Sequence, residues 1–186
     1  MSIPSPTESA AVESRRGEFL VSTDPARLDL DVIHNFLTNC YWAKAIPREV
    51  VARSIEHSLC FGIYDCTGEN SAPGAEALGA KWSRAERSEP EPRSPQVGFA
   101  RVVSDFATVA YLGDVFVLES HRGRGLGKWM VECIMQHPAL QGLRRWILLT
   151  RDAHELYAKS GFTSLKKPDR YMELHCPDVY QTRETT

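Results

Sequence analysis

The stretch Asp114–Lys128, which reads DVFVLESHRGRGLGK, decides the fold. After Asp114, the residues Val115–Leu118 form an apolar run typical of a β-strand. Three closely spaced glycines follow, Gly123, Gly125 and Gly127, and beyond them apolar residues recur at helical spacing. The segment therefore predicts a strand, then a glycine-rich loop, then the start of a helix.

This loop has the features that a bound diphosphate requires. Glycines let the backbone come close to a ligand and direct successive N–H groups at it. The start of a helix adds N–H donors without intrahelical partners and the positive end of the helix dipole. Arg122, Arg124 and Lys128 add positive charge. We therefore expect a diphosphate site, the alternative being a tight turn whose arginines only face solvent.

Two other phosphate-binding loops are excluded by their spacing. A Walker A loop has Ser or Thr after its Gly-Lys, whereas Trp129 follows Lys128 here and offers no hydroxyl for magnesium. A dinucleotide-binding loop has G-x-G-x-x-G, whereas the glycines of this loop alternate. The spacing that fits is R-x-x-G-x-G, with Arg122, Gly125 and Gly127 at the fixed positions.

The rest of the chain predicts further strands and helices in an α/β fold with a mixed sheet. The strands 96–103 and 111–118 are expected to form an antiparallel hairpin, because turn-forming residues lie between them. The predicted strands are 19–23, 59–64, 96–103, 111–118, 145–150 and 171–175, and the predicted helices are about 29–39, 47–58, 126–137 and 152–160.

Two stretches have a composition that disfavours packing. Residues 1–17 are rich in Ser, Pro, Glu and Ala and predict a disordered N-terminal tail. Residues 66–95 contain four prolines and clustered Glu and Arg, so we expect a flexible surface insertion between strands, whose Trp82 either docks on the body or marks a binding motif. A single domain over 18–176 and a C-terminal tail over 177–186 complete the expected organisation.

Composition limits the classes of partner and compartment. A formal net charge of -2 does not favour nucleic acid or an anionic membrane surface. No run approaches the roughly 20 apolar residues of a membrane span, and residues 1–16 carry no apolar run of a secretory signal. Five cysteines without a close C-x-x-C pair favour free thiols in a reducing compartment. We therefore expect a cytoplasmic protein, monomeric or homodimeric.

With these motifs in place, the chain resembles the GNAT (Gcn5-related N-acetyltransferase) superfamily. The first match is Asp114–Lys128, and the second is Leu156–Phe162, LYAKSGF, which is similar to the family's Leu-Tyr-x-x-x-Gly-Phe element. The resemblance covers the chain apart from its tails and the 66–95 insertion. It implies one N-acetyltransferase domain with a mixed, mostly antiparallel central sheet of six to seven strands, flanked by about four helices.

The resemblance also implies how acetyl-CoA is bound. In this family the pantetheine arm pairs with exposed backbone groups of the strand before the loop, and the loop amides hold the pyrophosphate. Carried over, the cofactor-binding residues are Val115, Phe116, Val117, Arg122, Gly123, Arg124, Gly125, Leu126, Gly127 and Lys128. No metal is expected, since the six histidines show no ligand-like spacing.

Two catalytic candidates follow. Tyr157 matches the family tyrosine that protonates the leaving CoA thiolate, and the alternative is a core aromatic residue with a hydrogen-bonded hydroxyl. Several relatives place an acidic residue or His where this chain has Tyr111, so the general base is open here. Asp114 interrupts an apolar strand and serves either as that base or as an anchor, and a water chain is a further candidate. Asp152 is expected to cap a helix.

The acceptor side rests on aromatic residues. Tyr41 and Trp42 precede a Pro-led helix and would line an amine pocket through cation–π contacts, or else pack in the core. Tyr111 is a third candidate. Together these features predict an acetyl-CoA-dependent N-acetyltransferase of a primary amine, with a small-molecule acceptor. The alternatives are a protein or peptide N-acetyltransferase and a non-catalytic acyl-CoA-binding regulatory module.

Overall fold

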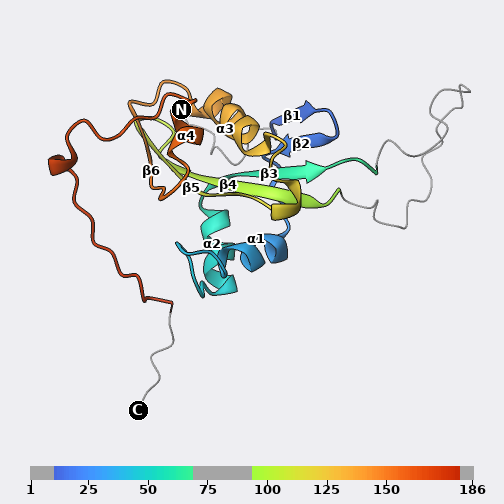
Figure 1. Ribbon diagram of the computed structural model, residues 1–186, viewed down its shortest axis with the longest axis horizontal. Helices are drawn as coiled ribbons and strands as arrows, with labels where there is room; N and C mark the ends of the chain where they lie inside the picture. The colour runs from blue at the N-terminus through green and yellow to red at the C-terminus, as the bar shows by residue number, and fades with distance from the viewer. Residues whose placement is uncertain (1–10, 69–93, 181–186) are drawn as a thin grey trace, which may run out of the picture.

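The computed structural model describes residues 11–68 and 94–180 of the 186-residue chain. A six-stranded sheet, with the strands in chain order from β1 to β6, lies between two layers of helices (Figure 1). Neighbouring strands are antiparallel except β5 and β6, which are parallel. The expected mixed, mostly antiparallel sheet with four helices is confirmed. The strands are β1 (Glu13–Arg16), β2 (Phe19–Ser22), β3 (Leu59–Asp65), β4 (Gln96–Ser104), β5 (Val109–Val117) and β6 (Arg145–Leu148).

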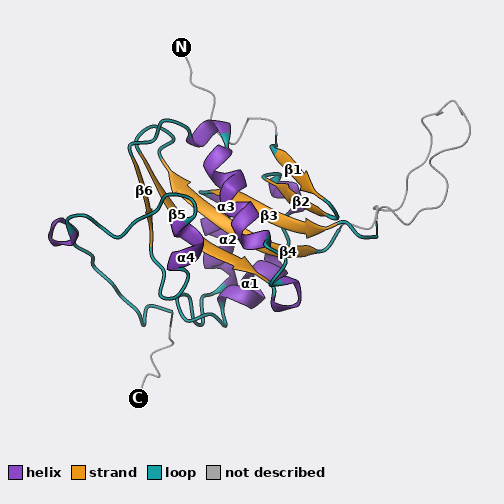
Figure 2. Ribbon diagram, turned by 45° about the horizontal axis from the view of Figure 1, so that its top comes forward, coloured by secondary structure: helices purple, strands orange, loops and turns teal. Residues whose placement is uncertain are grey.

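The helices cover the two faces of the sheet separately. On one face, Ile33 of α1 and Val51 of α2 pack against Phe99 and Phe116. On the other face, α3 and α4 build a second core with β4 and β5, and α4 lies at the β5–β6 end of the sheet (Figure 2). The helices are α1 (Leu30–Leu37), α2 (Arg48–Glu56), α3 (Leu126–Gln136) and α4 (His154–Ala158).

Strand β1 corrects the prediction of a disordered tail over residues 1–17. Residues Glu13–Arg16 pair antiparallel with β2 around a turn at Gly17, whose φ is +58°. Hydrophobic periodicity missed this strand because it is an edge strand of polar, mostly exposed side chains, held by its backbone. Residues 1–10 of the predicted tail lie outside the described residues.

The predicted last strand is also wrong. Tyr171–His175 pair with no described strand, and the side chains of Met172 and Leu174 are 98% and 96% exposed. An alternating pattern indicates which side chains share a face, but it does not supply the neighbouring strand that a sheet requires. Most of the predicted 66–95 insertion, including Trp82, lies outside the described residues.

The helix ends follow local chemistry in one case and not in another. Asp29 caps α1, since its carboxylate accepts from the backbone N–H groups of Asp31 and Val32. Asp152 does not cap α4, because Ala153 occupies the cap position and provides no side-chain hydrogen bond. Among the described residues, no helix has the length and apolarity needed to cross a membrane.

Candidate active site

A β-bulge in β5 sets the geometry of the site. Asp114 has a φ of +54°, and the pairing of β5 with β4 shifts register beside it. Before the bulge, Ala110 and Leu112 face the core under α3, whereas after it Val115 and Val117 do. One extra residue has therefore changed which side chains face α3, as a bulge does in a strand with a side-chain period of two.

Beyond the bulge, β5 continues without a strand on its β6 side. The parallel pairing of β5 with β6 ends at Leu112 and Leu148, whereas β5 runs on to Val117. On that side no described strand pairs with the backbone from Gly113 to Val117. Backbone N–H and C=O groups require partners. This open edge therefore suits an extended ligand such as a pantetheine arm, and it includes the predicted Val115, Phe116 and Val117.

The glycine-rich loop lies directly after this open edge. Gly123 and Gly125 have φ values of +77° and +73°, a region that side chains with a Cβ avoid. Gly125 is the N-cap of α3, and within the described residues no side chain caps the first N–H groups of this helix. A Cβ on Gly127 would lie 3.9 Å from Val117 and 4.0 Å from Leu156. The loop, the end of β5 and α4 therefore meet at one place.

The three cations of the loop are each engaged by protein groups. The Arg122 guanidinium donates through Nε to the Val117 carbonyl at 3.1 Å. The Arg124 guanidinium lies over the Phe19 ring, 5.9 Å from its centroid. The Lys128 ammonium is 3.4 Å from the Glu132 carboxylate. The capacity of the loop for anions therefore rests mainly on its backbone amides and on the helix dipole.

Tyr157 has a buried ring and an accessible hydroxyl. The residue is 8% exposed, and its ring packs edge-on against Phe162. Its hydroxyl makes no hydrogen bond within the described part of the chain and is not enclosed. Burial is the main cause that raises the pKa of Tyr157 to about 12. Electrostatic interactions with Tyr41, Tyr111 and Asp152 contribute to this rise in the same direction. The hydroxyl therefore keeps its proton at neutral pH and has no competing hydrogen-bond partner among the described residues.

Asp114 is held at both carboxylate oxygens. Arg101 Nε donates to Asp114 Oδ2 at 2.7 Å, and the two side chains are 19% and 13% exposed. Trp42 Nε1 donates to Oδ1 at 3.3 Å. Arg101 also donates through Nη1 to the Ser58 hydroxyl. These contacts tie the 41–46 loop to the bulge, which is what the anchor hypothesis requires.

The predicted acceptor residues are exposed aromatic side chains near Tyr157. Tyr41, Trp42 and Tyr111 are 49%, 43% and 37% exposed, so the core-packing alternative is wrong for Tyr41 and Trp42. Tyr41 and Trp42 pack edge to face at 4.9 Å. Burial, and then the charge of Asp114, raises the pKa of Tyr111. Tyr41 and Tyr111 therefore lie close enough to Tyr157 to interact with it electrostatically, and Asp114 lies as close to Tyr111.

Sequence reasoning missed two arginines of this site. Arg101 lies in the mostly apolar β4, and a charge of opposite sign in the neighbouring β5 was the available signal for the pair. The Arg151 guanidinium lies 3.8 Å from the centroid of the Tyr41 ring. The backbone N–H of Arg151 donates to the Tyr41 hydroxyl. One face of Tyr41 therefore already holds a cation.

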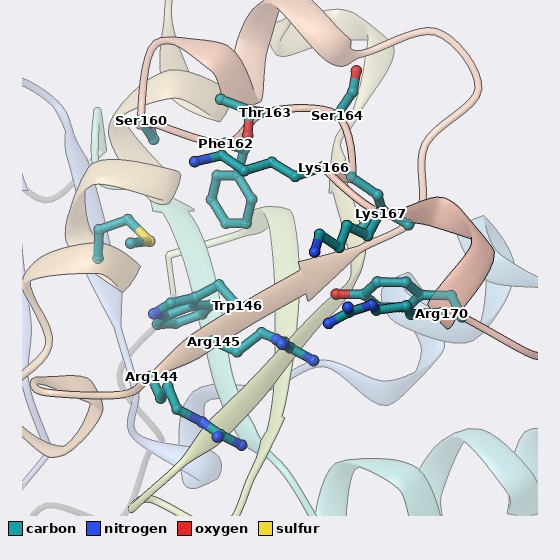
Figure 3. A pocket seen from close by; sticks show the side chains of 14 residues that line it. Arg144, Arg145, Trp146, Ser160, Phe162, Thr163, Ser164, Lys166, Lys167 and Arg170 are labelled. Atoms are coloured by element: carbon teal, nitrogen blue, oxygen red, sulfur yellow. The ribbon is translucent and has the colours of Figure 1, made fainter.

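Figure 3 shows a separate groove. Its volume is about 680 Å³. It is lined by Met135, by residues 144–146 at the start of β6, by residues 160–167 and by Arg170 and Tyr171. Arg145 at its edge pairs with Val109, so the groove is at the opposite end of β5 from the loop. None of the predicted site residues lines it, and its cations are Arg144, Arg145, Lys166, Lys167 and Arg170.

Within the described ranges, no three His, Cys, Asp or Glu side chains gather as metal ligands.

Comparison with known proteins agrees with this geometry. The family profile of the acetyltransferase (GNAT) domain matches residues 90–164. A proposed acetyltransferase of Gibberella zeae is 35% identical over 153 residues, which are 78% of either chain. The crystal structure of a proposed GNAT-family acetyltransferase from Xanthomonas campestris pv. campestris has 45% identity and a TM-score of 0.71, covering 88% of this chain and 97% of that chain.

A more distant likeness concerns the fold alone. A Mycobacterium tuberculosis protein, whose crystal structure is a complex with CoA, has 20% identity and a TM-score of 0.50, over 78% of this chain and 72% of that chain. The Gibberella and Xanthomonas relatives, each aligned over more than two thirds of its length, carry the assignment. The chain belongs to the GNAT family of acetyltransferases.

Proposed function

We propose that the protein transfers the acetyl group of acetyl-CoA to a primary amine of a small molecule. The observation that carries the proposal is the protonated hydroxyl of Tyr157, which has no hydrogen-bond partner among the described residues, in a fold that also leaves one edge of β5 open. The glycine-rich loop follows that edge directly. We assign the loop to the diphosphate of CoA, the edge to its pantetheine arm, and the Tyr157 hydroxyl to its sulfur, which is the order of these groups in CoA.

The donor is held mainly by backbone groups. The amides from Gly123 to Lys128 bind the diphosphate, since the left-handed glycines and the uncapped start of α3 direct N–H groups outward. The pantetheine arm pairs with the open backbone between Val115 and Val117. A backbone N–H near Val117 then polarises the thioester carbonyl, as an oxyanion donor does. The CoA-bound complex of the Mycobacterium protein supports this choice of donor.

The reaction requires three proton transfers, two from the amine nitrogen and one to the leaving thiolate. An unperturbed alkyl amine has a pKa of about 10.4, so the ammonium must first lose a proton, which passes to solvent through a water chain. The neutral nitrogen attacks the acetyl carbonyl, the new C–N bond forms as the C–S bond breaks, and the nitrogen loses its second proton to the same water chain. The thiolate leaves with the electron pair of the C–S bond and takes the proton of the Tyr157 hydroxyl. Tyr157 then regains a proton from solvent.

The acceptor is recognised by aromatic faces beside fixed charges. Trp42 and Tyr111 present exposed rings, and an amine that enters as a cation is attracted to such rings. Because Arg151 already covers a face of Tyr41, we assign the amine to the side of Trp42 and Tyr111. Asp114 pairs with Arg101 at 2.7 Å and holds this wall in place.

The proposal is tested by incubating the protein with acetyl-CoA and a panel of small primary amines and short peptides. Thiol release and mass spectrometry of the products are measured, with Tyr157→Phe as the matched control. We expect turnover with at least one small amine and little with the variant. Turnover on peptides alone would favour the peptide acetyltransferase, and tight CoA binding without any turnover would favour the non-catalytic module.

Replacing Asp114 by Asn separates the base from the anchor. Asn tolerates a positive φ and still accepts from Trp42, but it removes the charge that pairs with Arg101. Loss of a partly exposed ion pair costs about 1 kcal/mol, which is roughly a fivefold change. We expect kcat/KM to fall by about that factor, with an unchanged pH profile. A profile that loses an ionisation would identify Asp114 as the base.

A further inference from the structure

A residue outside both sequence motifs contacts the outer side of the glycine-rich loop. Arg16, the last residue of β1, donates through Nη2 to the backbone carbonyl of Arg124 at 3.2 Å. Its guanidinium also lies over the Trp129 ring of α3, 4.9 Å from the centroid. A Cβ built on Gly125 would be 3.5 Å from the same Nη2 atom. Arg16 therefore lies against the peptide that joins Arg124 to Gly125.

The geometry of this peptide gives the contact a consequence for the site. No peptide bond among the described residues is cis, and in a trans peptide the C=O and N–H groups point in opposite directions. A guanidinium at the Arg124 carbonyl therefore directs the Gly125 N–H away from Arg16. A cation at the carbonyl also polarises the peptide, which makes the N–H a stronger donor. Gly125 is the N-cap of α3, so this N–H lies at the positive end of the helix dipole.

The hairpin of β1 and β2 supports the loop at a second point. The Arg124 side chain extends over Phe19 of β2, while Arg16 of β1 holds the Arg124 carbonyl. Both views show this hairpin beside α3 (Figures 1 and 2). A strand of four residues with mostly exposed side chains adds little to the core. The role of β1 therefore lies in its contacts with the glycine-rich loop rather than in hydrophobic burial.

We propose that Arg16 is a positioning residue for the donor diphosphate: by holding the Arg124 carbonyl, it fixes the Gly125 N–H toward the bound diphosphate. This inference rests on the proposed function, since it takes the loop as the diphosphate site. Arg16 acts through the loop backbone and does not touch the reacting atoms. The simpler alternative is that Arg16 only covers Trp129 and contributes to stability.

The test compares Arg16→Met with Arg27→Met. Methionine keeps an unbranched apolar stem over Trp129 but removes the donors. Arg27 is a matched control, because its guanidinium also lies 4.9 Å from an aromatic centroid, that of Tyr64, and it forms an ion pair with Glu13 rather than a contact with the loop. Calorimetry gives the Kd of CoA. NMR titration gives the Kd of pantetheine, which lacks the diphosphate, and the Gly125 amide shift on CoA binding.

We expect Arg16→Met to weaken CoA binding about tenfold, as the loss of a charge-assisted contact does. The Kd of pantetheine should stay at the wild-type value, the CoA-induced shift of the Gly125 amide should shrink, and Arg27→Met should bind CoA normally. Arg16→Lys, which keeps a cationic donor, should recover part of the affinity and serves if the Met variant is unstable.

Two outcomes would overturn the inference while the wild-type protein binds CoA. One is an Arg16→Met variant with wild-type CoA affinity, and the other is an equal loss of CoA and pantetheine binding, which indicates general destabilisation. A wild-type protein that binds no CoA would instead overturn the proposed function, together with the inference that rests on it. The two failures are thus distinguished by the wild-type titration alone.

Discussion

Gly125→Val is expected to weaken CoA binding by ten- to a hundredfold. The backbone at Gly125 has a φ of +73°, which a β-branched residue adopts only at a cost of order 1–3 kcal/mol. A free energy of that size corresponds to roughly a ten- to a hundredfold change in the Kd of CoA. If the loop relaxes to avoid the strain, its amides no longer converge on the diphosphate. The effect is measured as the Kd of CoA by calorimetry, with circular dichroism to verify folding.

The structure changes the reason for this expectation. From the sequence we would attribute the loss to bulk in the path of the diphosphate. A Cβ at Gly125 would instead face the Arg16 guanidinium at 3.5 Å, an ordinary contact, so the backbone conformation is the cause. Gly127→Ala is the matched control, because its φ is not in the left-handed region and its Cβ would make ordinary contacts with Val117 and Leu156.

Arg124→Ala should weaken CoA binding less than Gly125→Val does. The Arg124 side chain lies over Phe19, and only its backbone carbonyl is held by Arg16. Its removal therefore takes away a mobile charge but leaves the amides in place. If Arg124→Ala is the more damaging substitution, side-chain charge rather than the backbone holds the diphosphate.

Tyr157→Phe is expected to lower kcat by about a hundredfold, the lower range of general acid catalysis, and to leave the Kd of acetyl-CoA unchanged. Phenylalanine keeps the ring that packs against Phe162 and removes only the hydroxyl that would protonate the thiolate. Steady-state kinetics with the best amine of the panel give kcat, and calorimetry gives the Kd. Tyr111→Phe is the control, since it removes a neighbouring hydroxyl that the mechanism does not use.

The pH dependence provides a second test of Tyr157. Burial raises its pKa to about 12, so the protonated form persists above the ordinary tyrosine value of 10. In the wild-type protein kcat should therefore show no loss of an acid between pH 8 and about 10. A kcat unchanged by Tyr157→Phe, or a wild-type kcat that falls within that pH range, would remove Tyr157 from the mechanism.

The parts of the fold that the sequence predicted are those with a local cause. The hairpin of β4 and β5, the loop and the start of α3 follow from apolar periodicity and glycine spacing, which act within a few residues. Strand β1 could not be predicted in this way, because its polar side chains carry no pattern and its pairing depends on β2. The pattern of Tyr171–His175 failed for the opposite reason, since it has alternation but no described partner strand.

The residues of the candidate site likewise differ in whether a local sequence pattern predicts them. The donor residues lie in one continuous segment, so a sequence motif located them together. Asp114 was conspicuous as a charge in an apolar strand, and Arg101 in β4 was the matching signal, but the register was needed to show that the two side chains face each other. Arg151 over Tyr41 and Arg16 at the loop join segments about 110 residues apart. Contacts of this kind depend on the fold and have no local signature.

A crystal structure of the protein with CoA tests the central claim most directly. We predict a diphosphate that accepts hydrogen bonds from amides between Gly123 and Lys128, a pantetheine arm along Val115–Val117, and a sulfur beside the Tyr157 hydroxyl. The basic groove beside Arg145 and Lys167 is the competing anion site. A diphosphate bound in that groove, with the glycine-rich loop empty, would contradict the account.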